Sequence, residues 1–343
     1  MQQNRHETDD DYSSPRVALA DAPPRQRHLL VIFNPTAGWW RGRRLRATLA
    51  QLERGGCRIT LRRTAGRGDA EAMARAAASE PSFDVVVAAG GDGTINEIIN
   101  GLAGATEGRR PLAILPLGTA NVLANEIGLP LGPAAVARTI VQGEARPIAL
   151  GRANGRCFAM MAGVGFDAHV VAGLDGRLKR LLGKGAYVVE SLRQLRRFAF
   201  PRYRVAIDGT NYEAASIIVA RGRFYGGRFV CAPEARLGAP EFQVCLFTRG
   251  GRWAVLRYGI ALALGFLPRL PDYRIVRGRR VTIDGPSGDP VQGDGDIIAA
   301  LPVGIELDRA PLRLITPDGA QSAARITVDQ DNLPTGDSSV TKR

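Results

Sequence analysis

The sequence has few cysteines, and nothing in their spacing would join them through a metal. Its four cysteines form no Cys-x-x-Cys pair, so we expect reduced thiols in the core of a cytosolic protein. Long hydrophobic runs are also missing. The longest, residues 253–267, is interrupted by Arg257 and is shorter than the ~18–20 apolar residues that span a bilayer. The polar, acidic N-terminus has no apolar segment of the secretory kind. These absences argue against a secreted protein, a zinc protein and an integral membrane protein.

The sequence has fewer acidic residues than basic ones. Lysine and arginine total 46 against 33 acidic residues, which leaves a net charge of +13 and favours anionic partners such as nucleotides and phospholipid headgroups. No nucleic-acid-binding module accompanies that charge, so we expect no nucleic-acid partner. A length of 343 residues is enough for two domains with their own cores.

The chain is organised around residues 83–102, FDVVVAAGGDGTINEIINGL. The apolar run at 83–89 predicts a buried strand, and the spacing of the isoleucines after it predicts a helix. Between them, Gly90-Gly91-Asp92-Gly93-Thr94 would bring glycine backbone to a helix N-terminus, which suits phosphate. A tight turn without a ligand would also explain the glycines. Asp92 favours a ligand site, because a carboxylate beside phosphate calls for a bridging Mg²⁺.

Two further loops follow predicted strands in the first half. Residues 34–38, NPTAG, come after a strand at 28–33, and residues 116–121, PLGTAN, come after a strand at 112–115. The alternation of strands and helices predicts a parallel sheet, in which ligands bind at the carboxyl ends of the strands. The spacing matches neither the Rossmann nor the P-loop pattern. We therefore expect one nucleotide site built from three loops, although Thr119 could simply cap the next helix.

The second half of the chain has a different sequence pattern. From about residue 146, short alternating runs are separated by turn pairs, which predicts an antiparallel sandwich: Asn154-Gly155, Asp208-Gly209, Gly226-Gly227 and Asp284-Gly285. Two helices are expected within it, at 177–198 and 253–267. The predicted organisation is α/β plus β: a disordered tail at 1–26, an α/β nucleotide-binding domain at 27–145, a β-sandwich at 146–320, and a second tail at 321–343. The active site is expected in the cleft between the domains.

Two carboxylates lie near the end of the predicted sandwich, in VQGDGD at 291–296. Asp294 and Asp296 could belong to a surface hairpin turn. They do not make a calcium loop, because the oxygen ligands stop at Ile298. A carboxylate within hydrogen-bond reach of a hydroxyl can serve as a general base. Both residues are therefore candidates for acid–base chemistry.

At these motifs the chain resembles the catalytic domain of diacylglycerol kinases, with sphingosine kinases and NAD kinases as more distant relatives. The resemblance runs from about residue 29 to about 317 and rests on NPTAG, GGDGTINE, PLGTAN and QGDGD. It implies a lipid kinase that uses ATP and Mg²⁺. It implies Asp92 as catalytic and metal-binding, Asp296 as the base in the place of the family's glutamate, and Asp294 as the competing base. The nucleotide-binding residues that it implies are Asn34, Thr36, Gly38, Gly90, Gly91, Gly93, Thr94, Asn96, Gly118, Thr119 and Asn121.

The chain departs from the family pattern at several acids. Val122 and Ala149 stand where relatives carry aspartate, and residues 237–240, LGAP, replace a metal-holding LDDG loop. These departures put the detailed metal network in doubt, although Glu126 could contribute to it. Two alternatives stay open: an NAD kinase or other small-molecule kinase, which shares the GGDGT loop, and a catalytically weak nucleotide-binding regulator, which these departures suggest.

The expected partners are a lipid alcohol and an anionic membrane surface. The region 177–198 alternates basic residues with leucines and valines, which is typical of interfacial helices. A helix that packs its leucines on the sandwich is the plainer interpretation. We expect a cytoplasmic protein that associates peripherally with the inner face of the membrane. The identity of the lipid stays open, as does a homodimer.

Overall fold

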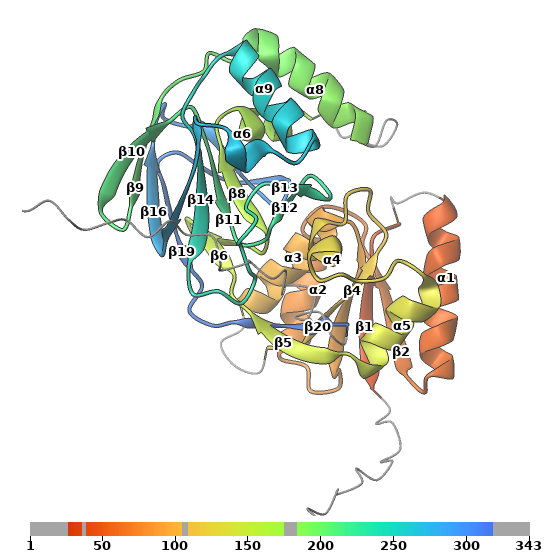
Figure 1. Ribbon diagram of the computed structural model, residues 1–343. Coiled ribbons are helices and arrows are strands. Elements are labelled where there is room, and N and C mark those ends of the chain that lie inside the picture. The colour runs from red at the N-terminus through yellow and green to blue at the C-terminus, as the bar shows by residue number, and fades with distance from the viewer. Residues whose placement is uncertain (1–26, 36–38, 105–108, 175–183, 318–343) are drawn as a thin grey trace, which may run out of the picture.

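The computed structural model describes residues 27–35, 39–104, 109–174 and 184–317, and these form two domains, each built on its own sheets (Figure 1). The first sheet has four consecutive parallel strands at one side, followed by the last strand of the chain and then by β5 (Glu144–Ile148) at the other edge. Its order is β2 (Arg58–Arg63), β1 (His28–Phe33), β3 (Val85–Gly90), β4 (Leu112–Pro116), β20 (Leu312–Thr316) and β5 (Glu144–Ile148).

Helices cover both faces of this sheet, as the continuous apolar runs of its central strands require. Leu30 and Ile32 of β1 belong to the core that α2 (Asp69–Ala78) and α3 (Asp92–Ala103) cover. Leu29 and Val31 face the opposite core, under α1 (Trp39–Arg54) and α5 (Pro133–Gln142). The short α4 (Val122–Glu126) follows β4. The parallel α/β domain expected from the sequence is confirmed.

The second domain is a sandwich of two six-stranded antiparallel sheets around one buried core. One sheet is β10 (Thr210–Ala214), β9 (Tyr203–Ile207), β16 (Arg280–Asp284), β19 (Val303–Leu307), β6 (Gly151–Ala153) and β7 (Arg156–Phe158). The other is β15 (Tyr273–Gly278), β14 (Phe242–Phe247), β11 (Ser216–Ala220), β8 (Met161–Val164), β17 (Pro290–Gly293) and β18 (Asp296–Ala300).

Three of the four expected turn pairs do join neighbouring antiparallel strands. They connect β6 with β7, β9 with β10, and the small ribbon β12 (Phe224–Tyr225) with β13 (Phe229–Val230). The fourth expectation, a hairpin at Asp284-Gly285, is wrong: β16 ends there, and the chain crosses to the other sheet. The hairpin turn considered for the two carboxylates of residues 291–296 is present: Asp294-Gly295 joins β17 to β18.

Three helices lie at one end of the sandwich: α6 (Phe166–Gly173), α8 (Lys184–Arg197) and α9 (Arg252–Ala263) (Figure 1). The expected helix at 177–198 falls partly outside the described residues, since α8 starts at Lys184. No helix within the described part of the chain is long and apolar enough to cross a membrane.

The last strand of the chain returns to the first domain. β20 pairs with β4 and, over its whole length, with β5. Residues 312–316 thus belong to the first sheet by their hydrogen bonds, although the sequence analysis placed them in the sandwich segment 146–320. No local pattern marks this return, because the pairing joins segments far apart in the chain.

Candidate active site

Three loops meet at the carboxyl ends of the adjacent strands β1, β3 and β4. Asn34, which follows β1, donates from Nδ2 to Oγ1 of Thr94 over 3.2 Å. The amide of Leu117, which follows β4, donates to the carbonyl of Gly90 over 2.9 Å. The parallel sheet therefore brings the NPTAG, GGDGT and PLGTAN segments together. Two of the expected nucleotide-binding residues, Thr36 and Gly38, lie outside the described residues.

Glycines let the second and third loops touch through their backbones. A Cβ atom at Gly118 would lie 2.6 Å from Cα of Gly91, and a Cβ atom at Gly90 would lie 2.6 Å from the Thr94 side chain. Asn121 fixes the third loop, since its side chain accepts from the amide of Gly118 over 2.8 Å and donates to the Gly118 carbonyl over 2.9 Å. Gly91 precedes α3 and gives it no side-chain cap. The first turn of α3 is thus an uncapped helix N-terminus, which suits an anion.

Asp92 ties these loops together. Its carboxylate accepts the amide of Asn121 over 3.0 Å and the amide of Val122 over 2.7 Å, at the start of α4. The expected alternative, in which Thr119 caps this helix, is wrong: Asn121 occupies the N-cap position and Thr119 is exposed. Burial raises the pKa of the Asp92 carboxyl. Each carboxylate oxygen keeps a second lone-pair site beside its backbone bond.

The two carboxylates of the QGDGD segment have different surroundings. Asp294 and Gly295 form the β17–β18 turn with φ angles of 52° and 89°, close to those of a type I′ turn. Asp294 accepts the amides of Ala159, Met160 and Met161 over 2.7, 2.9 and 3.0 Å, and Nδ2 of Asn96 over 3.2 Å. Four donors thus surround this carboxylate, and burial raises its pKa.

Asn96 lies at the contact between the two domains. It is buried, and its amide also donates to the carbonyl of Cys157 over 3.2 Å. The neighbouring Asn100 exchanges bonds with both the amide and the carbonyl of Cys157. These amides join α3 of the first domain to β7 of the second. Asn96 was expected to bind nucleotide; its side-chain amide is engaged between the domains.

Asp296 is the more open of the two carboxylates and lies over the glycine loop. A Cβ atom at Gly93 would be 3.0 Å from its Oδ2, so a side chain at position 93 would displace the Asp296 carboxylate. Its side chain is 34% exposed, and among the described residues it pairs with Arg67, which is 76% exposed and 3.5 Å away. Asp69 fixes the loop that carries Arg67 by accepting the amides of Ala65 and Gly66.

A hydrogen-bonded chain holds the turn beneath Asp296. Gln292 accepts the amide of Gly295 over 3.0 Å and donates to Oδ2 of Asp167 over 2.8 Å. Asp167 also accepts the hydroxyl of Tyr225, and burial raises its pKa. Asp167 belongs to α6, so this chain links the candidate base to the helical end of the sandwich. Tyr187 of α8 reaches the same turn, with its hydroxyl oxygen 3.8 Å from where a Cβ atom at Gly295 would lie.

A buried arginine binds the backbone at positions where the chain departs from the family pattern. Arg221 is fully buried and donates to the carbonyls of Ala149, Leu237, Ala239 and Glu241 over 2.6–3.0 Å. Burial lowers its pKa to about 10, so it stays charged at neutral pH. Glu126, a suggested contributor to the metal network, accepts the amides of Arg223 and Phe224 and pairs with the Arg223 guanidinium over 3.1 Å.

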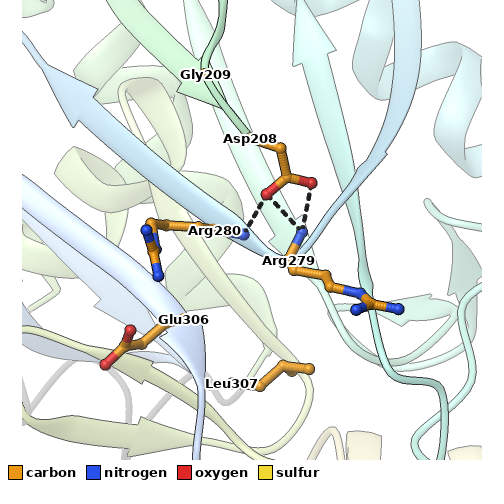
Figure 2. Close-up of a pocket in the computed structure, with 6 residues that line it drawn as sticks. All are labelled: Asp208, Gly209, Arg279, Arg280, Glu306 and Leu307. Carbon is orange, nitrogen blue, oxygen red and sulfur yellow. Dashed lines mark hydrogen bonds between the residues drawn. The ribbon is translucent and has the colours of Figure 1, made fainter.

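A hollow lies elsewhere, on the sandwich. It has a volume of about 580 Å³ and is lined by Asp208, Gly209, Arg279, Arg280, Glu306 and Leu307 (Figure 2). Asp208 accepts the amides of Arg279 and Arg280 there. None of the candidate site residues lines this hollow.

Comparison with known proteins agrees with this architecture. Residues 28–153 match the model of the diacylglycerol kinase catalytic domain, and residues 160–316 match the YegS C-terminal NAD kinase beta sandwich-like domain. The diacylglycerol kinase of Bacillus subtilis is 30% identical over 79% of this chain and 90% of its own. A Pseudomonas aeruginosa protein named "Probable lipid kinase YegS-like" is 32% identical over 84% of this chain and 99% of its own.

Solved structures of diacylglycerol kinases share this fold. The crystal structure of a diacylglycerol kinase from Bacillus anthracis strain Sterne superposes with a TM-score of 0.69 at 26% identity, covering 86% of this chain and 98% of that one. The fold, the loops and the relatives define a kinase. The chain belongs to the family of diacylglycerol kinase-like and YegS-like lipid kinases, which confirms the resemblance seen in its motifs.

Sequence reasoning missed Arg67 and the Gln292–Asp167–Tyr225 chain as a unit. A signal for Arg67 was available: Gly66-Arg67-Gly68 follows β2, whose carboxyl end lies beside that of β1. The bond from Gln292 to Asp167 had no such signal, because the two residues are 125 positions apart in the sequence.

Proposed function

We propose that this protein transfers the γ-phosphoryl group of ATP to the hydroxyl of a lipid alcohol, diacylglycerol-like or sphingoid-like. The observation that supports the proposal is the position of Asp296 beside Gly93, because it brings a carboxylate of the sandwich next to the glycine loop of the α/β domain. A phosphoryl transferred from a nucleotide on that loop would then lie beside the candidate base. Family membership supports both the kinase chemistry and the lipid acceptor.

Each proposed residue has a separate role in phosphoryl transfer. Backbone amides at the start of α3 bind the phosphates, the PLGTAN loop packs against that turn, and the Asn34–Thr94 hydrogen bond holds the loops in register. Asp296 accepts the proton of the lipid hydroxyl as its oxygen forms the new bond to phosphorus. The bond to the bridging oxygen of ATP breaks, and ADP leaves with that electron pair. Arg67 pairs with Asp296 and would neutralise charge on the transferred group.

Mg²⁺ fits the donors on this loop. The described residues contain no group of three His, Cys, Asp or Glu side chains that could hold a metal alone. Mg²⁺ commonly binds through one or two carboxylates together with substrate phosphates, and the buried Asp92 has lone-pair sites left for it. A cation there would also offset the burial that raises the pKa of Asp92. When bound, Mg²⁺ would neutralise phosphate charge during transfer.

The lipid acceptor implies a membrane encounter. We propose peripheral association with an anionic membrane, at the cytoplasmic face, as the setting of the reaction. A homodimer is a separate matter that this proposal does not require.

The experiment is a product analysis. Purified protein is incubated with labelled ATP and Mg²⁺ and with a panel of acceptors: diacylglycerol, sphingoid bases, other lipid alcohols and NAD. A phosphorylated lipid supports the proposal, and its loss in Asp296→Asn assigns the base. Phosphorylated NAD would instead support the small-molecule kinase, and ATP binding without any product would support the regulator. Asp296→Glu, which extends the side chain by one methylene, tests how closely the acceptor has to approach.

A further inference from the structure

The helix α9 has an apolar outward face. Trp253, Leu256, Ile260 and Leu264 recur at intervals of three and four residues, and Trp253 and Leu264 are 84% and 71% exposed. The opposite face is also apolar, with Tyr258 and Ala261 buried against the sandwich. Apart from Arg252 and Arg257 the residues of α9 are apolar, and exposed apolar side chains gathered on one face indicate an interaction surface. Within the part of the chain that the structure describes, no segment covers the outward side.

The helix α8 continues this surface. Val188, Val189 and Leu192 are exposed large hydrophobic residues on it. The two helices meet where Arg252 of α9 donates to the carbonyl of Arg196 of α8 over 3.3 Å. Both lie at the same end of the sandwich (Figure 1). We call these seven residues the α8–α9 face: Val188, Val189, Leu192, Trp253, Leu256, Ile260 and Leu264.

The charges around the α8–α9 face have one sign. Arginines surround the point where the helices meet, and all of these are exposed: Arg193, Arg196, Arg197, Arg249 and Arg252. The two helices contain one acidic residue, Glu190, and it is buried. An apolar surface with a basic border complements an anionic bilayer, which offers an apolar interior below negatively charged headgroups.

The helix α8 also connects this face to the candidate site. Tyr187 lies next to Val188 in sequence, yet its hydroxyl reaches within 3.8 Å of a Cβ position at Gly295, one residue before Asp296. One side of α8 therefore approaches the turn that carries the candidate base, while the other side carries exposed apolar residues.

We propose that the α8–α9 face docks on the surface of an anionic bilayer. The apolar stripe of α9 enters the boundary between headgroups and acyl chains, and the arginines contact the lipid phosphates. This placement rests on the proposed function, since it would bring a lipid hydroxyl toward Asp296 from the membrane side of α8. It differs from the docking expected from the sequence, because α9 carries most of the apolar contact.

The test is sedimentation with vesicles of phosphatidylcholine alone and of equimolar phosphatidylcholine and phosphatidylglycerol. We expect binding to the anionic vesicles that weakens with salt. Trp253→Ser combined with Leu264→Ser should lower the partition coefficient at least ~10-fold. Arg193→Gln combined with Arg196→Gln should lower it about 25-fold, since each basic residue near the surface contributes a factor of about five, or about 1 kcal/mol.

Matched controls come from the first domain. Leu131 is as exposed as Ile260, at 48% against 49%, and Arg54 is an exposed arginine in the last turn of α1. Leu131→Ser and Arg54→Gln should leave vesicle binding unchanged. Equal losses in the controls and in the α8–α9 variants would overturn the assignment of this face. So would a dimer in solution that Trp253→Ser with Leu264→Ser dissociates, because a second copy would then cover the face.

A kinase assay with a short-chain, monomeric lipid alcohol separates this proposal from the proposed function. The α8–α9 variants should phosphorylate the monomeric acceptor at the wild-type rate and lose activity only on vesicles. Activity on the monomeric acceptor without vesicle binding by the wild type would overturn the docking proposal and leave the kinase intact. Vesicle binding without phosphorylation of any acceptor would instead refute the proposed function.

Discussion

Asp294 and Asp296 are two residues apart, and we predict that their replacement by asparagine has opposite consequences. Asp294→Asn should destabilise the protein, whereas Asp296→Asn should leave stability unchanged and remove activity. The reason lies in their partners. Four donors converge on the carboxylate of Asp294, two on each oxygen, and its turn links the sandwich to α3. Asp296 has one long contact to an exposed arginine.

The expected loss of stability in Asp294→Asn follows from counting hydrogen-bond acceptors. An asparagine has a single carbonyl oxygen, so it can satisfy the donors of one oxygen and turns its NH₂ group toward the other two. Each buried donor without an acceptor costs about 1–3 kcal/mol, or about 2–6 kcal/mol for two. Removal of a carboxylate whose pKa is raised by burial offsets part of this cost. Even 2 kcal/mol would lower Tm by about 4–8 °C.

Asp296→Asn loses only an exposed ion pair, which contributes at most about 1 kcal/mol. Its kcat should fall by about 10²–10⁴-fold, the usual contribution of a general base, with little change in ATP affinity. Thermal unfolding, ATP binding and phosphoryl transfer of both variants make the measurement. A stable Asp294→Asn protein without activity would refute the reasoning and make Asp294 the chemical group. Collapsed ATP binding in Asp296→Asn would mark Asp296 as a nucleotide or metal ligand.

Three further changes probe the same loops. Asp92→Asn should lower kcat at saturating Mg·ATP by ~10²-fold or more, equivalent to about 2.7 kcal/mol, and wild-type turnover would rule out a metal role. Gly93→Ala should lower kcat while Tm holds or rises, because its Cβ would crowd Asp296. Gly42→Ala in α1, whose Cβ would make only an ordinary 3.8 Å contact with the Arg46 side chain, is the control and should leave kcat unchanged. Arg221→Met should lower the unfolding free energy by about 3 kcal/mol or more in a denaturant titration, and an unchanged midpoint would show that the four carbonyls find other donors.

Much of the fold was predictable because its signals are local. Apolar runs of four to six residues alternate with helical patterns in the first half, and parallel pairing then brings every loop after a strand to one edge. The contacts of Asn34 with Thr94 and of Gly91 with Gly118 follow from that rule alone. The turn pairs likewise predicted the sandwich. The return of β20 to the first sheet was not predictable, since no short-range pattern distinguishes it from a sandwich strand.

The division of roles within the site was less predictable. In sequence, Asp294 and Asp296 are two equivalent acids around a glycine. They separate only in three dimensions, because the turn directs Asp294 toward the amides of Met160 and Met161 and leaves Asp296 over Gly93. Asn96 is similar: its motif matches a nucleotide site, but its neighbours across the domain contact decide what its amide binds.

The position of β20 governs the order in which the protein can be completed during synthesis. β20 lies between β4 and β5, and within the described chain β5 has no other strand neighbour. While the ribosome is still making the sandwich, the edge of β4 has no partner and β5 has no place in the sheet. The α/β domain, encoded first, is therefore finished last, when residues 312–316 emerge. A chain that ends early in its final strand would expose an unpaired strand edge, the feature that invites aggregation. Translation thus yields a complete sheet only from a nearly complete chain.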